Sequence, residues 1–580
     1  MLKRLMKCVR EYKLPSLLAP AFVTGEVILE VIIPIIMAAL IDNGLGSEQA
    51  NMSYIIKMGI VLVLVCMLSL ACGTFSGNYA AKASAGFAKN MRHDMFYNIQ
   101  TYSFKNIDKF STSSLVTRLT TDVTNVQNAY MMIIRTAVRG PAMLILSVIA
   151  TAIISPKLSL IFLVAIPILG VTIFALSLKV HPIFEKVFKG YDKLNNVVGE
   201  NLHGIRVVKS FVREDHEKEK FGNVSTEVYK LQSKAEKLLA FNQPVMMLCV
   251  YGCMIALSWF GSNMIVNSGA TELTTGQLTS MFTYTMQILM SLMMLSMIFV
   301  MVIMSRASIK RIVEVLEETP DIKDPENPDY NITDGSIEFK NVSFSYAGKG
   351  GTNCISDINL KINAGETIGI IGGTGSAKST FVQLIPRFYD VTEGEILVGG
   401  KDVREYDIPA LRGEVAMVLQ KNVLFSGTIK DNLRWGKEDA TDEEIERACK
   451  LSQADEFIST FPDGYDTYIE QGGTNVSGGQ KQRLCIARAL IKKPKILILD
   501  DSTSAVDTRT DALIRKAFAE EIPDTTKLII AQRISSVMNS DKIIVLDGGR
   551  INDFGTHEEL LARNEIYQEV YYSQQKGGLE

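Results

Sequence analysis

The stretch GGTGSAKST, residues 372–380, decides the fold of the C-terminal part of this chain. It follows an apolar run, TIGII (367–371), that is typical of a buried strand, and a helical pattern comes after it. A glycine-rich loop between a strand and a helix cradles phosphate groups with its backbone N–H groups. The stretch therefore predicts a nucleotide-binding α/β domain. The alternative, a glycine-rich turn that binds no nucleotide, loses its support once the residues below are added.

The residue types in this loop predict how a nucleotide is held. The Lys378 ammonium is expected to reach the β- and γ-phosphates, and the Ser379 hydroxyl is expected to bind Mg²⁺. ATP and Mg²⁺ are therefore the expected cofactors. The other loop residues expected around the phosphates are Gly372, Gly375, Ser376, Ala377 and Thr380.

A second signal is the apolar run ILIL (496–499), which ends in Asp500. An apolar strand that ends in an acid is common and mostly structural when it stands alone. Beside a phosphate loop, a carboxylate at a strand end is placed to hold Mg²⁺, because this ion prefers oxygen ligands. We therefore expect Asp500 and Ser379 at one magnesium site.

The run NVSGGQKQR (475–483) resembles the signature of ABC ATPases. Further elements of that family stand in the expected order. Tyr346 is similar to the aromatic residue that stacks on adenine, and Gln420 to the glutamine that senses Mg²⁺ and couples to the membrane domain. Residues 504–507 (SAVD) resemble the loop that bridges two ATPase domains. The resemblance covers essentially the whole chain.

The resemblance implies a fold, an activity and a partner. ABC exporters have a six-helix transmembrane domain with long cytoplasmic extensions, followed by an α/β ATPase domain that drives transport. The stretches 110–123 and 200–211 look like their cytoplasmic coupling helices. Because one membrane half and one ATPase half make a half-transporter, a second half-transporter is required. In such a dimer the signature of one chain completes the ATP site of the other, and its residues here are Ser477, Gly478, Gly479 and Gln480.

Two departures from the family pattern affect hydrolysis. Asp501 stands where the family has a glutamate that polarises the attacking water, and one methylene fewer withdraws the carboxylate by ~1.5 Å. Gln532 replaces a histidine, and a glutamine can carry neither a proton nor a positive charge. Withdrawal of the Asp501 carboxylate by ~1.5 Å costs about 100-fold in the rate of hydrolysis. We expect Asp501 and Gln532 as the catalytic residues of a site that binds ATP but hydrolyses it poorly.

A third departure is Ala377, which replaces the last glycine before the lysine and is expected to be tolerated if its φ angle allows. The signature itself is intact, so it can serve a competent site on a different partner. These residues favour a heterodimer. A homodimer with a slow, aspartate-based ATPase is the alternative.

Six apolar segments precede residue 310, and each is long enough for a membrane span, which takes about 20 residues. They lie near 15–41, 54–76, 130–153, 157–179, 241–266 and 278–304. The N-terminus and the long stretches 77–129 and 180–240 carry many Lys and Arg residues, which places them in the cytoplasm. The ATPase domain is expected on the same side.

The texture of the sequence changes along the chain. Residues 1–318 are expected to form the transmembrane domain with two cytoplasmic coupling loops, and residues 319–334, rich in Pro, Asp and Asn, a linker. From residue 335 to 580, short β-rich runs alternate with helical patterns, as in an ABC nucleotide-binding domain. The predicted fold class is therefore multidomain, all-α and then α/β.

The overall composition excludes other classes of function. A net charge of −3 leaves no basic excess for nucleic-acid binding, and the eight cysteines lack the spacing of a zinc site. The basic N-terminus is followed by an apolar segment too long for a cleavable signal peptide. We expect an integral protein of a bacterial inner (plasma) membrane.

Charged residues inside the spans bear on the substrate. Glu26 and Glu30 share one face of the first span, and Arg135 and Arg139 share one face of the third. They either form a structural ion pair or line a cavity for cationic or amphipathic substrates. The sixth span is rich in methionine, which suits ordinary packing or a pocket that accepts many shapes. We expect export of amphipathic small molecules, drug-like or lipid, in contact with membrane lipids; a homodimeric lipid flippase or multidrug exporter is the alternative.

Overall fold

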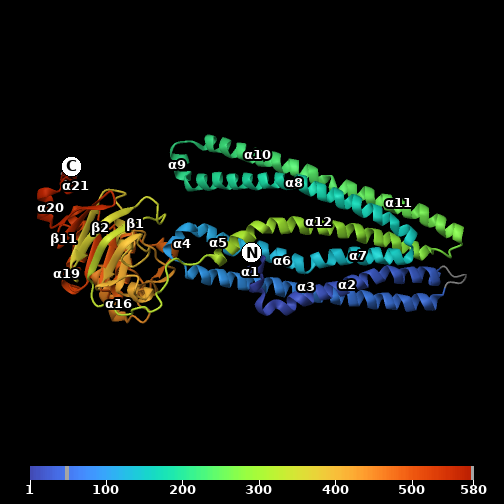
Figure 1. The fold of residues 1–580 in the computed structure, drawn as a ribbon, viewed down its shortest axis with the longest axis horizontal. Coiled ribbons are helices and arrows are strands. Elements are labelled where there is room, and N and C mark those ends of the chain that lie inside the picture. Colours follow the sequence, from blue (N-terminus) through green and yellow to red (C-terminus); the bar gives the residue numbers. More distant parts are fainter. Residues whose placement is uncertain (46–50, 577–580) are drawn as a thin grey trace. The chain divides into compact units, whose positions relative to one another are not determined.

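The computed structural model describes residues 1–45 and 51–576. They form two compact units (Figure 1). The first, the helical unit, consists of Met1–Gln100 and Ser111–Glu318. The second, the sheet unit, consists of Thr101–Phe110 and the chain from Thr319 onward.

Long α-helices make up most of the helical unit. In chain order they are α1 (Leu2–Leu5), α2 (Lys13–Leu40), α3 (Met52–Gln100), α5 (Thr112–Thr117), α6 (Val123–Ile134), α7 (Thr136–Ile154), α8 (Pro156–His203), α9 (Ile205–Ser210), α10 (Glu214–Ala240), α11 (Asn242–Ser268) and α12 (Thr275–Glu317). Shorter 3-10 and π-helical turns join them at η1 (Met6–Tyr12), η2 (Ile41–Leu45) and η3 (Arg118–Asp122). Among the described residues, six helical stretches are long and apolar enough to cross a membrane. The first five predicted segments fall within these stretches, and the sixth, 278–304, overlaps the stretch Thr275–Leu295.

The turn between α7 and α8 shows how the sequence ends one span and begins the next. Ser155 closes α7 in an extended conformation, and its hydroxyl accepts a hydrogen bond from the Leu158 backbone N–H at 3.5 Å. Pro156 occupies the first turn of α8, where its missing N–H is not needed. Ser155 and Pro156 therefore make a tight turn between the two helices.

The last helix of this unit is longer than a membrane span. Thr274 and Gln277 form a reciprocal capping box that starts α12, with hydrogen bonds of 3.2 and 3.1 Å. The helix then continues without a break to Glu317. The C-cap of the helix is Glu318, the last residue of the helical unit.

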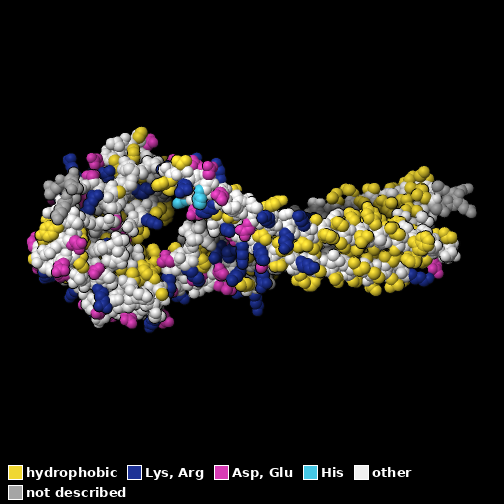
Figure 2. All heavy atoms as spheres, turned by 90° about the horizontal axis from the view of Figure 1, so that it is seen from above, with side chains coloured by type: hydrophobic (Ala, Val, Ile, Leu, Met, Phe, Trp, Pro, Cys, Tyr) yellow, Lys and Arg dark blue, Asp and Glu magenta, His cyan; other side chains and the backbone are white. Residues whose placement is uncertain are grey.

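The surface of the helical unit is suited to lipid. Large apolar side chains such as Leu163, Trp259 and Ile153 are 70%, 69% and 78% exposed. Figure 2 shows hydrophobic side chains covering one part of this unit almost continuously, with Lys and Arg side chains where that cover ends. Soluble proteins rarely expose apolar surface on this scale, whereas a bilayer stabilises it.

Three of the four intramembrane charges, Glu26, Glu30 and Arg139, form one ionic cluster, which we call the α2–α7 cluster. Arg139 on α7 donates from Nη1 to Glu26 Oε1 at 2.5 Å and from Nη2 to Glu30 Oε1 at 2.7 Å. Glu26 is 8% exposed, and a Cβ added at Gly73 on α3 would lie 2.9 Å from its Oε1. Arg135 lies beside Gly77, one turn further along α3. Because Arg139 binds both glutamates, the geometry favours the structural ion pair over a lining of free carboxylates.

The segment Thr101–Phe110 belongs to the sheet unit although it lies between helices of the helical unit in the sequence. Its helix α4 (Phe104–Lys109) stacks Phe104 on Phe388 with ring centroids 4.1 Å apart, and Asp108 accepts a hydrogen bond from Tyr389 at 2.6 Å. Of the stretch 110–123 that resembles a coupling helix, Phe110 belongs to the sheet unit and the remaining residues belong to the helical unit. The apolar side chain of Phe104 provides a contact that groups its segment with the sheet unit.

The sheet unit contains two main sheets. Its strands are β1 (Ile337–Phe344), β2 (Ile355–Ile362), β3 (Thr367–Gly372), β4 (Glu393–Val398), β5 (Lys401–Asp402), β6 (Val415–Val418), β7 (Gly427–Thr428), β8 (Tyr468–Ile469), β9 (Ile496–Asp500), β10 (Thr526–Ile530), β11 (Lys542–Asp547) and β12 (Arg550–Gly555). A six-stranded sheet has the order β12-β11-β3-β10-β9-β6, and only its edge strand β12 is antiparallel. An antiparallel sheet has the order β2-β1-β4-β5, and β7 pairs with β8.

Helices cover the six-stranded sheet and connect its strands. They are α13 (Lys378–Gln383), α14 (Ile408–Glu414), α15 (Ile429–Arg434), α16 (Asp442–Leu451), α17 (Asp455–Ile458), α18 (Gly478–Ile491), α19 (Thr508–Glu521), α20 (His557–Arg563) and α21 (Glu565–Lys576), with 3-10 turns η4 (Gly464–Asp466), η5 (Gln471–Gly473) and η6 (Ile534–Ser536). Alternate strand residues point to opposite faces. Ile496 and Ile498 join a core with the antiparallel sheet, while Leu497 and Leu499 join a core with the helices. Burial on both faces explains why these strands read as continuous apolar runs.

Candidate nucleotide-binding site

The parallel strands bring distant parts of the sequence to one edge of the sheet. In the register of the ladder, Ile530 at the end of β10 lies between Ile370 of β3 and Asp500 of β9. The loops that follow these strands carry the phosphate loop, Asp501 and Gln532. The carboxyl edge of an open parallel sheet is where such folds bind ligands.

The backbone of the phosphate loop explains its glycines. A Cβ at Gly372 would collide with the carbonyl oxygen of Leu546, and Gly375 has a φ of +85° that side chains disfavour. Ala377 has a φ of 69°, so this alanine also occupies the left-handed region. The methyl group there costs about 1 kcal/mol. The departure at Ala377 is accommodated, but at the cost of backbone strain.

Lys378 begins α13 and its ammonium lies over the loop. Nζ donates to the carbonyl oxygens of Gly372 at 2.7 Å and Gly373 at 2.8 Å, and Ser376 Oγ lies 3.4 Å away. Burial lowers the pKa of Lys378, while the Asp500 and Asp501 carboxylates oppose that shift. The ammonium is thus half-buried and held at the loop where phosphate oxygens would compete for its protons.

Ser379 and Asp500 form the expected oxygen pair. Ser379 Oγ donates to Asp500 Oδ1 at 3.0 Å, and Asp500 is 2% exposed. Burial raises the pKa of Asp500, Asp501 raises it further, and Ser379 and Lys378 lower it. A buried carboxylate beside a hydroxyl is the donor set that Mg²⁺ prefers, so these residues fit the ion.

The two residues that depart from the family pattern contact each other. Gln532 Nε2 donates to Asp501 Oδ2 at 2.8 Å, and the Asp501 backbone N–H donates to the Ile530 carbonyl at 3.1 Å. Burial raises the pKa of Asp501, while hydrogen bonds from Gln532 and Gln420 and the charges of Lys378 and Arg533 lower it. Gln420 follows β6 and thus reaches the same carboxylate from the next strand of the sheet.

The adenine-stacking candidate Tyr346 is 46% exposed and contacts other side chains. Its hydroxyl lies 3.1 Å from Thr380 Oγ1, and its ring meets Tyr389 edge-on at 5.2 Å. Phe344 also meets this ring at a steep angle, with centroids 4.9 Å apart, and the 46% exposure of Tyr346 is compatible with stacking on a base. The contact between Tyr346 and Thr380 therefore links the adenine-stacking candidate to the phosphate loop.

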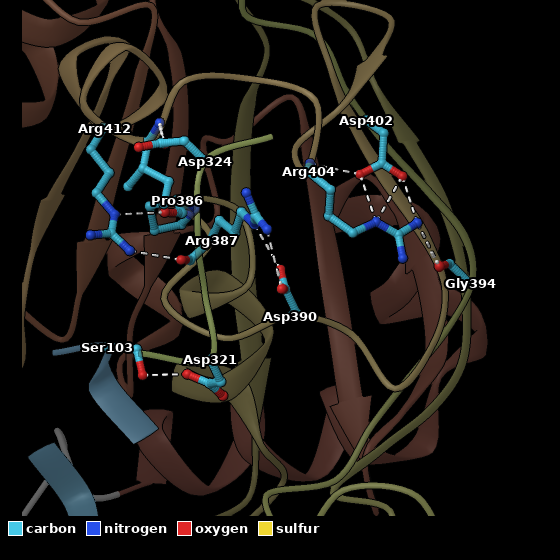
Figure 3. Close-up of polar contacts among 11 residues, drawn as sticks. Ser103, Asp321, Asp324, Pro386, Arg387, Asp390, Gly394, Asp402, Arg404 and Arg412 are labelled. Atoms are coloured by element: carbon cyan, nitrogen blue, oxygen red, sulfur yellow. Dashed lines mark hydrogen bonds and ion pairs between the residues drawn. The ribbon is translucent and has the colours of Figure 1, made fainter. Parts of the chain in front are cut away.

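The loop that carries Tyr389 is fixed by two arginines (Figure 3). Arg412 donates to the carbonyl oxygens of Pro386 at 3.2 Å and Arg387 at 2.8 Å. Arg387 in turn forms an ion pair of 2.8 Å with Asp390. Tyr389 lies between these anchors, so its ring is a firm support for Tyr346.

The signature residues occupy a different place. Ser477 caps α18: its hydroxyl accepts from the Gln480 N–H at 3.3 Å, and its own N–H donates to Gln480 Oε1 at 2.9 Å. Ser477 and Gly478 are exposed at the start of the helix. Within the described residues, no hydrogen bond joins Ser477, Gly478, Gly479 or Gln480 to the phosphate loop of the same chain.

One residue of this region was missed from the sequence. Gln482, 6% exposed, accepts from the Ala505 N–H at 2.9 Å and donates to Ser504 Oγ at 3.2 Å. A Cβ at Gly479 would lie 2.8 Å from the Ala505 carbonyl oxygen, so the helix and the 504–507 loop touch closely. The available signal was the polar Gln482 inside the run 475–483, because a buried amide needs hydrogen-bond partners.

Family models and known relatives agree with this architecture. The model of the ABC transporter transmembrane region matches residues 17–311, and the ABC transporter model matches residues 355–504. An uncharacterised ABC transporter ATP-binding protein of Bacillus subtilis, YfiB, is 37% identical over 576 residues, which are 99% of this chain and 98% of that protein. An ATP-dependent lipid A-core flippase of Desulfotalea psychrophila is 32% identical over 487 residues, 84% of each chain.

A solved structure shares the fold. The structure of a bacterial Atm1-family ABC exporter with ATP bound superposes with a TM-score of 0.80, at 24% identity, over 98% of both chains. Exporters of this type work as dimers of half-transporters, and the six apolar helices make this chain an integral membrane protein. The chain therefore belongs to the ABC transporter family, as an exporter-type half-transporter whose ATP-binding domain is an ATPase coupled to transport.

Proposed function

We propose that this half-transporter binds Mg²⁺ and ATP at its own site but hydrolyses ATP there poorly, and that its signature completes a competent site on a different partner chain. The observation that carries the proposal is the contact between Gln532 and Asp501 at 2.8 Å. Transport would then be driven mainly at the partner's site. The protein would act in a bacterial inner membrane with its N-terminus and ATPase domain in the cytoplasm.

The chemistry of the pair limits catalysis. A general base must reach the attacking water with a free carboxylate oxygen. The shorter side chain of Asp501 withdraws its carboxylate by ~1.5 Å relative to a glutamate, and the hydrogen bond from Gln532 to Oδ2 orients this carboxylate without closing that gap. The Gln532 amide cannot accept a proton or supply a positive charge at the γ-phosphate. Binding groups remain in place while the hydrolytic pair is weakened.

The binding roles follow from the residues assembled at the sheet edge. Tyr346 would stack on adenine, and the backbone of residues 372–380 with Lys378 would hold the phosphates. Ser379, Asp500 and Gln420 would hold Mg²⁺, which neutralises charge on the phosphate oxygens when bound. Ser477, Gly478, Gly479 and Gln480 would contact ATP on the partner chain, since an exposed helix start is free to meet another molecule.

The proposed cargo is an amphipathic small molecule, drug-like or lipid, moved out of the cytoplasm or the inner leaflet. The α2–α7 cluster speaks against a cationic drug as the specific cargo, because Arg139 occupies both glutamates. One relative is named an ATP-dependent lipid A-core flippase, which supports a lipid-like substrate. A homodimeric flippase is the second candidate, and it would need substantial hydrolysis at this chain's own site.

The test separates binding from turnover in the purified chain, reconstituted in lipid nanodiscs. Binding of a fluorescent ATP analogue should depend on Lys378, so Lys378→Ala should lower its affinity. Steady-state hydrolysis should be lower by about 100-fold than in a reference exporter with the glutamate and histidine. Hydrolysis at the reference rate by the chain alone would overturn the weak-site proposal and support the homodimer.

A further inference from the structure

The last described helix, α21 (Glu565–Lys576), packs beside the loop that carries Gln532. Ile566, Val570 and Tyr571 of this helix are partly buried against the core that contains Ile534 and Val537. Apolar burial of this kind fixes the position of the helix relative to η6 (Ile534–Ser536). The helix is therefore a firm base for polar contacts with that loop.

Gln574 makes two such contacts, one on each side of Arg533. Its Nε2 donates to the Gln532 carbonyl oxygen at 2.8 Å, and its Oε1 accepts from the Ile534 N–H at 2.9 Å. Only one orientation of the amide satisfies both, because the carbonyl can only accept and the N–H can only donate. The side chain of Gln574 thus satisfies the Gln532 carbonyl and the Ile534 N–H, which in a β-strand would pair with a neighbouring backbone.

The contact acts directly on the weak hydrolytic pair. The residue whose carbonyl Gln574 holds is the same residue whose side chain donates to Asp501 Oδ2 at 2.8 Å. Asp501 is held from the other side by its N–H on the Ile530 carbonyl at 3.1 Å. If the Gln532 backbone shifted by about 1 Å, its side-chain amide could not keep this distance.

We propose that Gln574 is a positioning residue for ATP hydrolysis, which fixes the backbone of residues 532–534 from the C-terminal helix and so aims the Gln532 amide at Asp501. The proposal rests on the roles proposed for Asp501 and Gln532. It makes α21 a part of the ATP site although none of its side chains is expected to touch the nucleotide. It also gives the C-terminal end of the chain an influence on the rate of hydrolysis.

A matched control lies at the next position. Gln575 Nε2 donates to the Tyr571 hydroxyl at 2.6 Å, so its contact stays inside α21. Gln574→Met and Gln575→Met keep the length of each side chain and remove its amide. Gln574→Glu keeps the acceptor for the Ile534 N–H but loses the donor to the Gln532 carbonyl.

The experiment uses the full chain in nanodiscs and combines two measurements. Single-turnover hydrolysis of radiolabelled ATP should be about tenfold slower in Gln574→Met, with ATP affinity changed by less than about twofold. Hydrogen exchange of the backbone around 531–536 should be faster in the same variant. Gln575→Met should match the unmodified chain in both, and Gln574→Glu should keep Ile534 protected while it slows hydrolysis.

Two results would overturn the positioning role. One is equal hydrolysis in Gln574→Met and Gln575→Met, whatever the exchange rates. The other is a loss of rate in Gln574→Met that comes with an equal loss of ATP affinity and of thermal stability, as a purely structural contact would give. The absolute rate of the unmodified chain tests the proposed weak site, whereas the ratio between the two variants tests Gln574, so the two failures are distinguishable.

Discussion

Gln532 and Asp501 lie on loops that follow neighbouring parallel strands, and the amide of the first donates a hydrogen bond of 2.8 Å to the carboxylate of the second. The register of β9 and β10 places Ile530 opposite Asp500, which brings the two loops together. Asp501 and Gln532, with thirty residues between them in the sequence, therefore act as one hydrogen-bonded pair. Their effects on hydrolysis should be coupled, as expected for side chains in direct contact.

The pH dependence of the residual hydrolysis should reveal Asp501. Burial raises the pKa of this carboxyl group, and only the ionised form can accept a proton from water. Activity should therefore fall on acidification at a pH above the ordinary aspartate value of about 3.9. The Gln532 hydrogen bond lowers the pKa, so Gln532→Met should move the acid limb to still higher pH. A pH–rate profile of each chain checks this, and an acid limb that Gln532→Met leaves in place would contradict it.

Replacement of Ala377 by glycine should stabilise the ATPase domain. With φ at 69°, the alanine methyl group costs about 1 kcal/mol that glycine does not pay. Ala377→Gly should have a higher midpoint of thermal unfolding. A separate binding measurement should show a higher affinity for ATP. Ala512→Gly is the matched control, because the same change inside helix α19 should destabilise by about 1 kcal/mol. Equal shifts in the two variants would contradict the strain at Ala377.

The magnesium requirement should depend on the Ser379–Asp500 pair. Removal of either oxygen donor in Ser379→Ala or Asp500→Asn should raise the Mg²⁺ concentration needed for half-maximal ATP binding by tenfold or more, on the order expected for loss of a metal-site partner. Titration with Mg²⁺ at fixed ATP measures this. Binding of ATP in the presence of a chelator should stay nearly unchanged in Ser379→Ala. An unchanged Mg²⁺ titration in both variants would contradict the assignment.

The α2–α7 cluster should stabilise the fold of the membrane domain. Arg139→Met leaves the buried Glu26 and the partly buried Glu30 without a counter-ion and should destabilise by about 3 kcal/mol. The triple change Arg139→Met, Glu26→Gln, Glu30→Gln removes all the charges and should be close to the unmodified chain in thermal unfolding in nanodiscs. If the single and triple variants unfolded alike, the cluster would not act as an ion pair.

Much of the fold could be predicted because its signals are local. The six spans follow from run length, and β3 and β9 follow from apolar runs that end at the phosphate loop and at Asp500. The phosphate-loop residues were assigned from type and spacing alone, and their contacts with ATP stay a prediction. The Ala377 φ angle could not be predicted, since the sequence does not give the conformation of a loop.

The contacts that depend on distant packing could not be predicted. Gln574 and Gln532 are forty-two residues apart, and nothing in their order shows that a helix returns to the loop. The segment Thr101–Phe110 groups with the ATPase domain because Phe104 packs on Phe388, and no local pattern in the sequence shows that contact. The sequence placed Glu26 and Glu30 on one helix face, but the binding of Arg139 to both depends on how α2 and α7 face each other.

The most direct test of the account is ATP hydrolysis by the purified chain carrying Asp501→Glu and Gln532→His together. The longer carboxylate should reach the attacking water, and the histidine should supply the charge that the amide lacks. The account predicts that the double variant hydrolyses ATP about 100-fold faster than the unmodified chain, with similar ATP affinity, and that each single change gives much less. The account would be contradicted if the unmodified chain already hydrolysed ATP rapidly and the double variant were no faster.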